Sequence, residues 1–278
     1  MESSSAHADE VRKGERFRFG ENWWRFLSVL NEERVTAAER SLQALTGLQR
    51  MDGKTVLDVG SGSGLFSLAA CRLGGSVTSF DFDPQSVACA VELRRRYAVH
   101  DGQWTIRQGS VLDREFLAGL PDFDLVYSWG VLHHTGQMWA AIENAASRVG
   151  QGGMFAIALY NDQGIRSRVW RKIKQVHCAS APGRWLTSVV FYPLFALAQL
   201  LVDLLHGRNP VATYRSYHRS ARGMSVVHDW ADWLGGYPFE VATPGDVFHF
   251  MQDRGFALVT MKTTSSPGCN EFVFRRER

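Results

Sequence analysis

The stretch Thr55-Val-Leu-Asp-Val-Gly-Ser-Gly-Ser-Gly-Leu-Phe decides the fold class of this 278-residue chain. A short apolar run typical of a buried strand leads into glycines at alternate positions, Gly60, Gly62 and Gly64, and the pattern that follows is typical of a helix. Glycine permits positive φ and lets a ligand approach the backbone closely. Strand–loop–helix units of this kind bind nucleotide-like ligands at the carboxyl ends of parallel strands.

The same alternation of strand and helix patterns continues along the chain. After the strand at 55–59, the sequence predicts strands at 76–80, 104–108, 124–128 and 154–160 and helices at 65–72, 84–97 and 137–149. A helix at 244–254 and two strands at 257–263 and 271–275, joined by a short Gly/Pro link, predict an antiparallel hairpin at the sheet edge. Alternating strands and helices indicate an α/β fold with a mostly parallel, Rossmann-like sheet.

The chain divides into five segments by pattern. The small polar residues of 1–14 predict a disordered tail, and the helical apolar spacing at 21–48 predicts a helical cover over 15–50. The core covers 51–161, and 241–278 completes it with the last helix and strand pair. Between them lies a helical insertion at 162–240, rich in arginine, tryptophan and long apolar runs.

The residues around the glycines indicate which ligand the loop binds. A dinucleotide fingerprint needs a third glycine where this chain has Leu65. Asp58, within the strand, would oppose a pyrophosphate but suits an ammonium group. Asp81 ends the second strand about 20 residues after Gly60, where a carboxylate accepts hydrogen bonds from ribose hydroxyls. A ribose, a cationic group and no phosphate describe S-adenosylmethionine (SAM).

Four motifs then carry a family resemblance: Val56-Leu-Asp-Val-Gly-Ser-Gly-Ser-Gly, Ser79-Phe-Asp-Phe-Asp-Pro, Gln108-Gly-Ser-Val-Leu-Asp and Phe123-Asp-Leu-Val-Tyr-Ser-Trp-Gly-Val-Leu-His-His. In order and spacing they resemble the class I SAM-dependent methyltransferases, and most of all the bacterial small-molecule branch labelled polyprenyl-benzoquinol methylase-like. That label does not establish a quinone substrate. The resemblance implies a seven-stranded class I methyltransferase sheet with a helical N-terminal cover and a helical insertion after strand five.

The resemblance also implies a cofactor-binding set drawn from the cover and the ends of the first four strands: Asn22, Trp23, Asp58, Gly60, Ser61, Gly62, Asp81, Phe82, Ser110, Val111, Leu112, Ser128 and Trp129. The glycine loop would pack on the methionine moiety with Asp58 facing its amino group. Asp81 would hold the ribose, and Phe82 would lie along the adenine. Asp83, beside them, is expected to cap the next helix rather than to contact the ligand.

Candidates for the chemistry lie at the rim and in the insertion. A base is needed only if the acceptor is protonated, and histidine titrates in the relevant range. His134, after strand four, and His228, beside Asp229 in the insertion, are the two candidate bases. Tyr160, Asn161 and Tyr237 are candidate substrate contacts. No CxxC pair suggests a metal site.

Charge and composition limit the partners and the location. The chain has 31 Lys and Arg against 28 Asp and Glu, too even a balance to favour a nucleic-acid partner. The first residues contain acids and no apolar h-region, so a cytoplasmic protein is expected. The apolar run at 187–205 favours a lid helix lining the substrate cavity. A peripheral membrane helix is the next alternative, because a basic stretch precedes it: Arg166, Arg168, Arg171, Lys172 and Lys174. A true membrane span is the last alternative.

The sequence therefore predicts methyl transfer from SAM to a small molecule, at oxygen first and then carbon or nitrogen, in an apolar aromatic pocket. Two alternatives stay open: a SAM-consuming enzyme without methyl transfer, such as one cyclising SAM with release of methylthioadenosine, and a non-catalytic SAM-binding sensor or partner subunit. Asn161-Asp-Gln-Gly lacks the Asn/Asp-Pro-Pro-Tyr/Phe motif of nucleobase amino methyltransferases.

Overall fold

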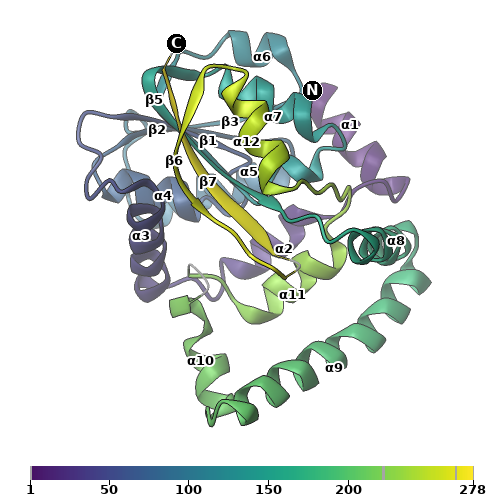
Figure 1. Cartoon of the computed structure of the whole chain (residues 1–278). Coiled ribbons are helices and arrows are strands. Elements are labelled where there is room, and N and C mark those ends of the chain that lie inside the picture. The colour runs from purple at the N-terminus through teal and green to yellow at the C-terminus, as the bar shows by residue number, and fades with distance from the viewer. Residues whose placement is uncertain (1, 221–222, 267, 278) are drawn as a thin grey trace.

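The computed structural model describes residues 2–220, 223–266 and 268–277, which contain a seven-stranded sheet of order β3-β2-β1-β4-β5-β7-β6. The strands are β1 (Thr55–Val59), β2 (Ser76–Asp81), β3 (Trp104–Gln108), β4 (Phe123–Trp129), β5 (Val149–Tyr160), β6 (Phe256–Lys262) and β7 (Cys269–Arg276). The first five are parallel, and β7 pairs antiparallel with both β5 and β6 (Figure 1). The predicted fold class and edge hairpin are confirmed.

Helices cover both faces of the sheet, because successive strand residues point to opposite faces. Val56 belongs to the hydrophobic cluster under α3 (Glu32–Thr46), α4 (Leu65–Arg72) and α5 (Pro84–Arg96). Its neighbour Leu57 belongs to the cluster under α6 (Arg114–Ala118), α7 (Met138–Ala146) and α12 (Pro244–Gln252). With both faces buried, the parallel strands need near-continuous apolar runs, which is the pattern that the sequence has.

Local signals fix several helix ends. Asp83 caps α5, since its Oδ1 accepts a hydrogen bond from the Gln85 backbone N–H at 2.8 Å, and Pro84 occupies the first turn. Gly47 ends α3 in the left-handed conformation with φ of 73°. The expected cap at Asp83 is therefore confirmed.

The expected disordered tail at 1–14 is wrong for the described part of that segment. Residues Glu2–Arg12 form helix α1, followed by α2 (Phe19–Phe26). His7 of α1 is buried and lies with its Nε2 3.4 Å from Asp83 Oδ2, and the Arg16 side chain pairs with Glu10 at 2.5 Å. Because polar contacts rather than an apolar stripe hold α1, its sequence resembles that of a frayed terminus.

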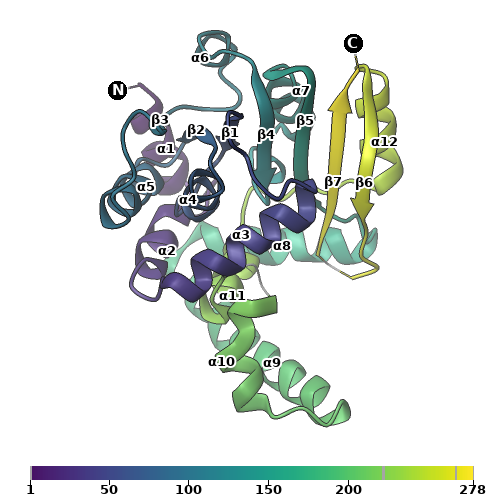
Figure 2. The same ribbon diagram turned by 90° about the vertical axis from the view of Figure 1, so that its left-hand side faces the viewer.

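The insertion is helical, as predicted. It consists of α8 (Ile165–Ala179), α9 (Ala181–Leu205), α10 (Pro210–Ser220) and α11 (Val226–Gly235). Figures 1 and 2 show α9 and α10 projecting beyond the carboxyl ends of the strands, while α11 packs beside α2 and α8 close to the sheet. The short helix η1 (Leu132–His134) follows β4 at the same edge.

Candidate functional site

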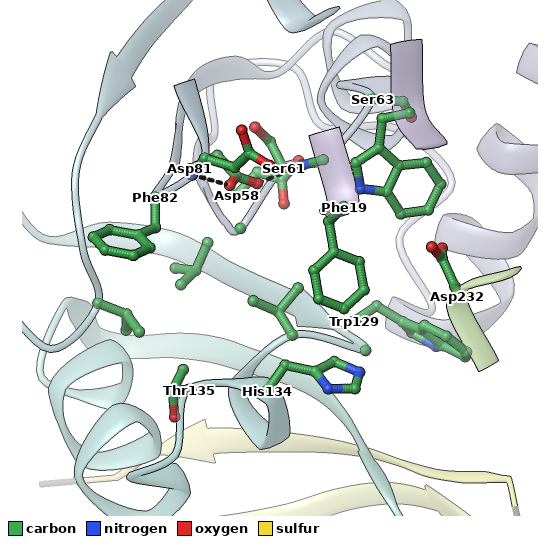
Figure 3. Close-up of a pocket in the computed structure, with 18 of the residues that line it drawn as sticks. Phe19, Asp58, Ser61, Ser63, Asp81, Phe82, Trp129, His134, Thr135 and Asp232 are labelled. Atoms are coloured by element: carbon green, nitrogen blue, oxygen red, sulfur yellow. Dashed lines mark hydrogen bonds between the residues drawn. The ribbon is translucent and has the colours of Figure 1, made fainter. Parts of the chain in front are cut away.

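A cavity of about 730 Å³ lies outside the carboxyl ends of β1, β2 and β4. This is the place where the strand order reverses, and open α/β sheets bind their ligands there. Its walls come from the strand ends, from the N-terminal helix α1, from α2 of the cover, and from α10 and α11 of the insertion. Figure 3 shows Asp58, Ser61 and Asp81 at one side, with Trp129, His134 and Asp232 farther along.

The glycine loop forms a tight cradle. Gly60 and Gly62 have φ of 75° and 54°, and a Cβ added at Gly60 would clash with Val131. A Cβ added at Gly62 would lie 2.8 Å from Nε1 of Trp23. Between them the Oγ of Ser61 is buried and has no hydrogen-bond partner within the described residues, although it lines the cavity. Since buried hydroxyls are normally hydrogen-bonded, this one fits a polar ligand atom.

Two buried carboxylates face the same end of the cavity. Asp58 Oδ2 accepts from the Ser67 hydroxyl at 2.5 Å, and burial raises the pKa of Asp58 to about 7. Asp81 accepts from the backbone N–H groups of Gly62 and Asp83, both at 2.9 Å, and burial raises its pKa to about 6. Neither has an ion-pair partner in the described chain, so a ligand with an ammonium group and hydroxyls fits them.

The predicted adenine end of the cavity is covered by α1. Phe82, Ser110, Val111 and Leu112 line it as predicted. The edge of the His7 ring meets the Phe82 ring at 5.5 Å between centroids. His7 and Glu10 in this wall were not among the predicted residues, because the α1 sequence has no apolar period that indicates a helix.

The far end of the cavity is aromatic and is built by the insertion. Trp23, Trp129 and Tyr160 line it, as predicted, and α10 and α11 add residues that the sequence analysis did not select: Tyr217, Asp229, Trp230, Asp232 and Trp233. No residue of α9 lines the cavity, so the expected role of that apolar helix as a pocket-lining lid is wrong.

His134 lines the cavity as a neutral ring. Its Nδ1 lies 2.6 Å from the Pro238 carbonyl oxygen. Because a carbonyl only accepts, Nδ1 carries the proton and Nε2 is an acceptor. Burial, with a smaller contribution from the charge of Lys174, lowers the pKa of His134 to about 3. His134 therefore accepts a hydrogen bond at neutral pH without being a strong base.

Asp232 is a buried carboxyl group at the aromatic end. Its Oδ1 accepts from the Asn22 side-chain amide at 2.7 Å, and Figure 3 places it on the same side of the cavity as Trp129. Burial, and the nearby charge of Asp229, raise its pKa well above the usual carboxyl range. The sequence signal was its spacing, because Asp229 and Asp232 are one helical turn apart and share a face.

Two further predicted contacts do not face the cavity, one on β4 and one directly after β5. Ser128 is buried, but its hydroxyl donates to the Val59 carbonyl at 3.0 Å and does not line the cavity. The Asn161 amide donates to the Thr264 carbonyl at 2.7 Å, so it fixes the β6–β7 connection instead of facing substrate. Strand alternation turns Trp129 toward the cavity and Ser128 away from it.

Three further predicted residues hold the cover and insertion together instead of lining the cavity. The Asn22 amide donates to the backbone carbonyl of His228 and to Asp232, joining α2 to α11. The His228 ring packs against Phe26 at 5.8 Å between centroids, away from the cavity. Tyr237 accepts a backbone bond at its carbonyl and does not line the cavity. The expected cavity contacts of these residues are therefore wrong: Asn22 and His228 face the contact between α2 and α11, and Tyr237 lies in the loop after α11.

Comparison with known proteins shows what the central part of the chain is similar to. Residues 57–155 match the family model described as a methyltransferase domain. The ubiquinone biosynthesis O-methyltransferase of Methylobacterium nodulans is 27% identical over 168 residues, covering 56% of this chain and 65% of that protein. Its counterpart in Xanthomonas euvesicatoria is 31% identical over 57% of this chain and 64% of that protein. The chain thus spans somewhat less than two thirds of these relatives.

Solved structures agree on the fold. Magnesium protoporphyrin IX methyltransferase from Synechocystis, with bound S-adenosylhomocysteine (SAH), superimposes with a TM-score of 0.52 at 15% identity, over 87% of this chain and 83% of that one. The cyclase SpnF superimposes with a TM-score of 0.53 at 12% identity, over 86% and 79%.

The strand order of the sheet and a methyltransferase-domain match that runs from β1 into β5 indicate the same class of fold. Residues 57–155 match a methyltransferase domain, and the fold is similar to that of the class I SAM-dependent methyltransferases, whose cofactor is SAM. Because the same fold also occurs in a cyclase, the fold does not identify the acceptor or the reaction.

Proposed function

We propose that this protein transfers the methyl group of SAM to a hydroxyl oxygen of a small molecule, with carbon and nitrogen acceptors as the next choices. One observation carries the proposal: a single cavity joins the glycine loop and its two buried carboxylates to an aromatic compartment. The similarity to ubiquinone biosynthesis O-methyltransferases supports oxygen as the acceptor atom and a small molecule as the substrate.

The cavity residues divide between the parts of the cofactor. Asp58 would face the ammonium group, and the Ser61 hydroxyl would find its missing partner on the methionine moiety. Asp81 would accept from the ribose hydroxyls, with the adenine between Phe82 on one side and Val111 on the other. When bound, SAM supplies an electrophilic methyl group on a sulfonium, and the protein contributes mainly proximity and alignment.

The aromatic compartment would hold and deprotonate the acceptor. His134 offers Nε2 as a hydrogen-bond acceptor that orients a hydroxyl. The Asp232 carboxyl is the better proton acceptor of the two, because its raised pKa lies closer to that of the group it must deprotonate. Asp232 therefore replaces His228 as candidate base. Trp129 and Trp233 offer flat apolar surfaces for an aromatic acceptor.

Product analysis tests the proposal against its alternatives. The purified protein is incubated with SAM and a panel of phenols, catechols, amines and carbon acids, and the products are separated by mass. SAH together with a methylated phenol or catechol supports the proposal, whereas methylthioadenosine indicates displacement without methyl transfer. Tight SAM binding with no turnover on any acceptor favours a sensor or partner subunit. If calorimetry detects no heat of binding with SAM or with SAH, the cofactor assignment itself is overturned.

A further inference from the structure

Helix α9 exposes a broad apolar face. Its 25 residues have a mean hydropathy of 1.9 over their most apolar window, long and apolar enough to cross a membrane by length and composition. Trp185 near its start is 68% exposed and Leu205 at its end 84%. Large apolar side chains lie exposed along the length between them: Leu186, Val189, Val190, Leu194, Leu197, Leu200, Leu201, Val202 and Leu204. Figures 1 and 2 show the helix standing away from the sheet.

The opposite face of α9 is attached to the rest of the insertion. Tyr192 and Phe195 pack against Trp230 of α11, with ring centroids 6.5 and 5.9 Å apart. Phe195 also contacts Trp233 at 5.5 Å. The helix therefore has a packed face and an open face, and the open face is apolar. Exposed apolar patches of this extent indicate an interaction surface.

The charges around α9 favour a bilayer as the occupant. Residues 163–217 contain eight basic residues and one acid, Asp203, whereas the whole chain carries only +3. Asp203 is buried and accepts from Gln199, and the buried Lys174 donates to the Trp233 carbonyl. The other basic residues of the segment are exposed: Arg166, Arg168, Arg171, Lys172, Arg184, Arg208 and Arg215. An apolar face flanked by exposed cations suits a surface of anionic lipid.

We propose that α9 docks on an anionic bilayer, lying along its surface with the open face in the acyl-chain boundary. At 1.5 Å per residue the helix is about 38 Å long, sufficient for a span. A span would, however, place its two ends on opposite sides of the membrane, whereas α8 before it and α11 after it pack against each other. Docking along the surface leaves that packing intact. Because Trp230 contacts α9 and lines the cavity, the aromatic end of the cavity then faces the bilayer side.

Vesicle flotation with the full-length protein tests this. The protein is mixed with vesicles of phosphatidylcholine alone or with 30% phosphatidylglycerol added. We expect the wild type to float with the anionic vesicles and to bind at least tenfold less to neutral vesicles, or to anionic ones in 1 M salt. The triple change Leu194→Glu, Leu197→Glu and Leu201→Glu should reduce binding to anionic vesicles at least tenfold.

A matched control separates the helix from general surface hydrophobicity. Val91, Val259 and Met261 are also exposed apolar residues, but they lie on α5 and β6. Changing these three to Glu should leave flotation within twofold of the wild type. Calorimetry with SAH checks that each variant keeps its fold, and it reports separately on the proposed cofactor, so failure of one proposal does not imply failure of the other.

Four results would overturn the docking proposal. The first is no flotation of a wild type that still binds SAH, and the second is equal losses of flotation in the two triple variants. The third is light scattering that shows a stable dimer which the α9 triple variant abolishes, because a second copy then covers the face. The fourth is resistance of vesicle-bound protein to alkaline carbonate extraction, since that indicates a span; release by carbonate supports surface docking.

Discussion

Replacing Asp81 with alanine tests the central assignment of the site. The carboxylate lies at the end of β2 and is held by two backbone N–H groups of the loops around it. If it accepts hydrogen bonds from two ribose hydroxyls, each charge-assisted bond contributes about 1.5–3 kcal/mol. The loss of both should cost at least about 3 kcal/mol of binding, a reduction in affinity of about two powers of ten.

The same change should have little effect on the stability of the free protein. Burial raises the pKa of Asp81 to about 6 from its usual value near 3.8, so the stabilising protonated form is lost as pH rises through that range. At pH 7.5 the wild type therefore carries the cost of a buried charge, which Asp81→Ala removes. This gain in the free energy of unfolding offsets the cost of leaving two backbone N–H groups without an acceptor. We therefore expect a Tm within about 4 °C of the wild type.

Calorimetry with SAH at pH 7.5, together with thermal unfolding, measures both quantities. Asp124→Ala is the matched control: its carboxylate also accepts from a backbone N–H, that of Thr55, but at the opposite end of β1 and away from the cavity. It should bind SAH as the wild type does. An Asp81→Ala protein that binds SAH within threefold of the wild type would show that this carboxylate does not hold the ribose.

Three further outcomes follow from the site. SAM affinity should fall about tenfold from pH 8 to pH 6, because Asp58, with a pKa of about 7, loses its charge over that range. The Asp58→Asn variant should bind SAM with little pH dependence. If this variant keeps the wild-type dependence of affinity on pH, the ammonium contact is contradicted. Gly62→Ala should displace Trp23, lower the Tm by about 2–4 °C and weaken SAH binding measured by calorimetry. Unaltered SAH binding would show that the glycine loop tolerates a Cβ at this position. Asp232→Asn should reduce the rate of methyl transfer about 100-fold or more and leave SAH affinity unchanged, while His228→Gln should retain wild-type turnover. Equal losses of turnover in the two variants, measured in a steady-state assay, would show that Asp232 is not the base.

Much of the fold and of the cofactor end could be predicted because the signals are local. Buried parallel strands need apolar runs, and the turn after β1 needs positive φ, so the sequence from Thr55 to Gly64 predicts a strand and its loop without knowledge of the partners. The structure brings Asp58 and Asp81 into one cavity because the carboxyl ends of adjacent parallel strands meet at the same edge.

Predictions failed where a side chain's direction depends on a distant partner. Helix α1 is held by contacts such as that of His7 with Asp83, far away in sequence, and its own residues show no apolar period. In α11, His228 and Asp232 are four residues apart, and the sequence alone does not indicate which of the two side chains lines the cavity. Only the packing of Asn22 and Phe26 of α2 against this helix turns Asp232 inward and His228 aside.

The sequence by itself thus determined the parallel sheet, the glycine cradle and the two carboxylates, because backbone conformation and strand ends follow from residue types at fixed spacing. The tertiary structure alone decided the acceptor compartment. The helices in its walls are α2, α10 and α11, whose relative rotation is set by contacts across the chain, and no local period encodes that rotation.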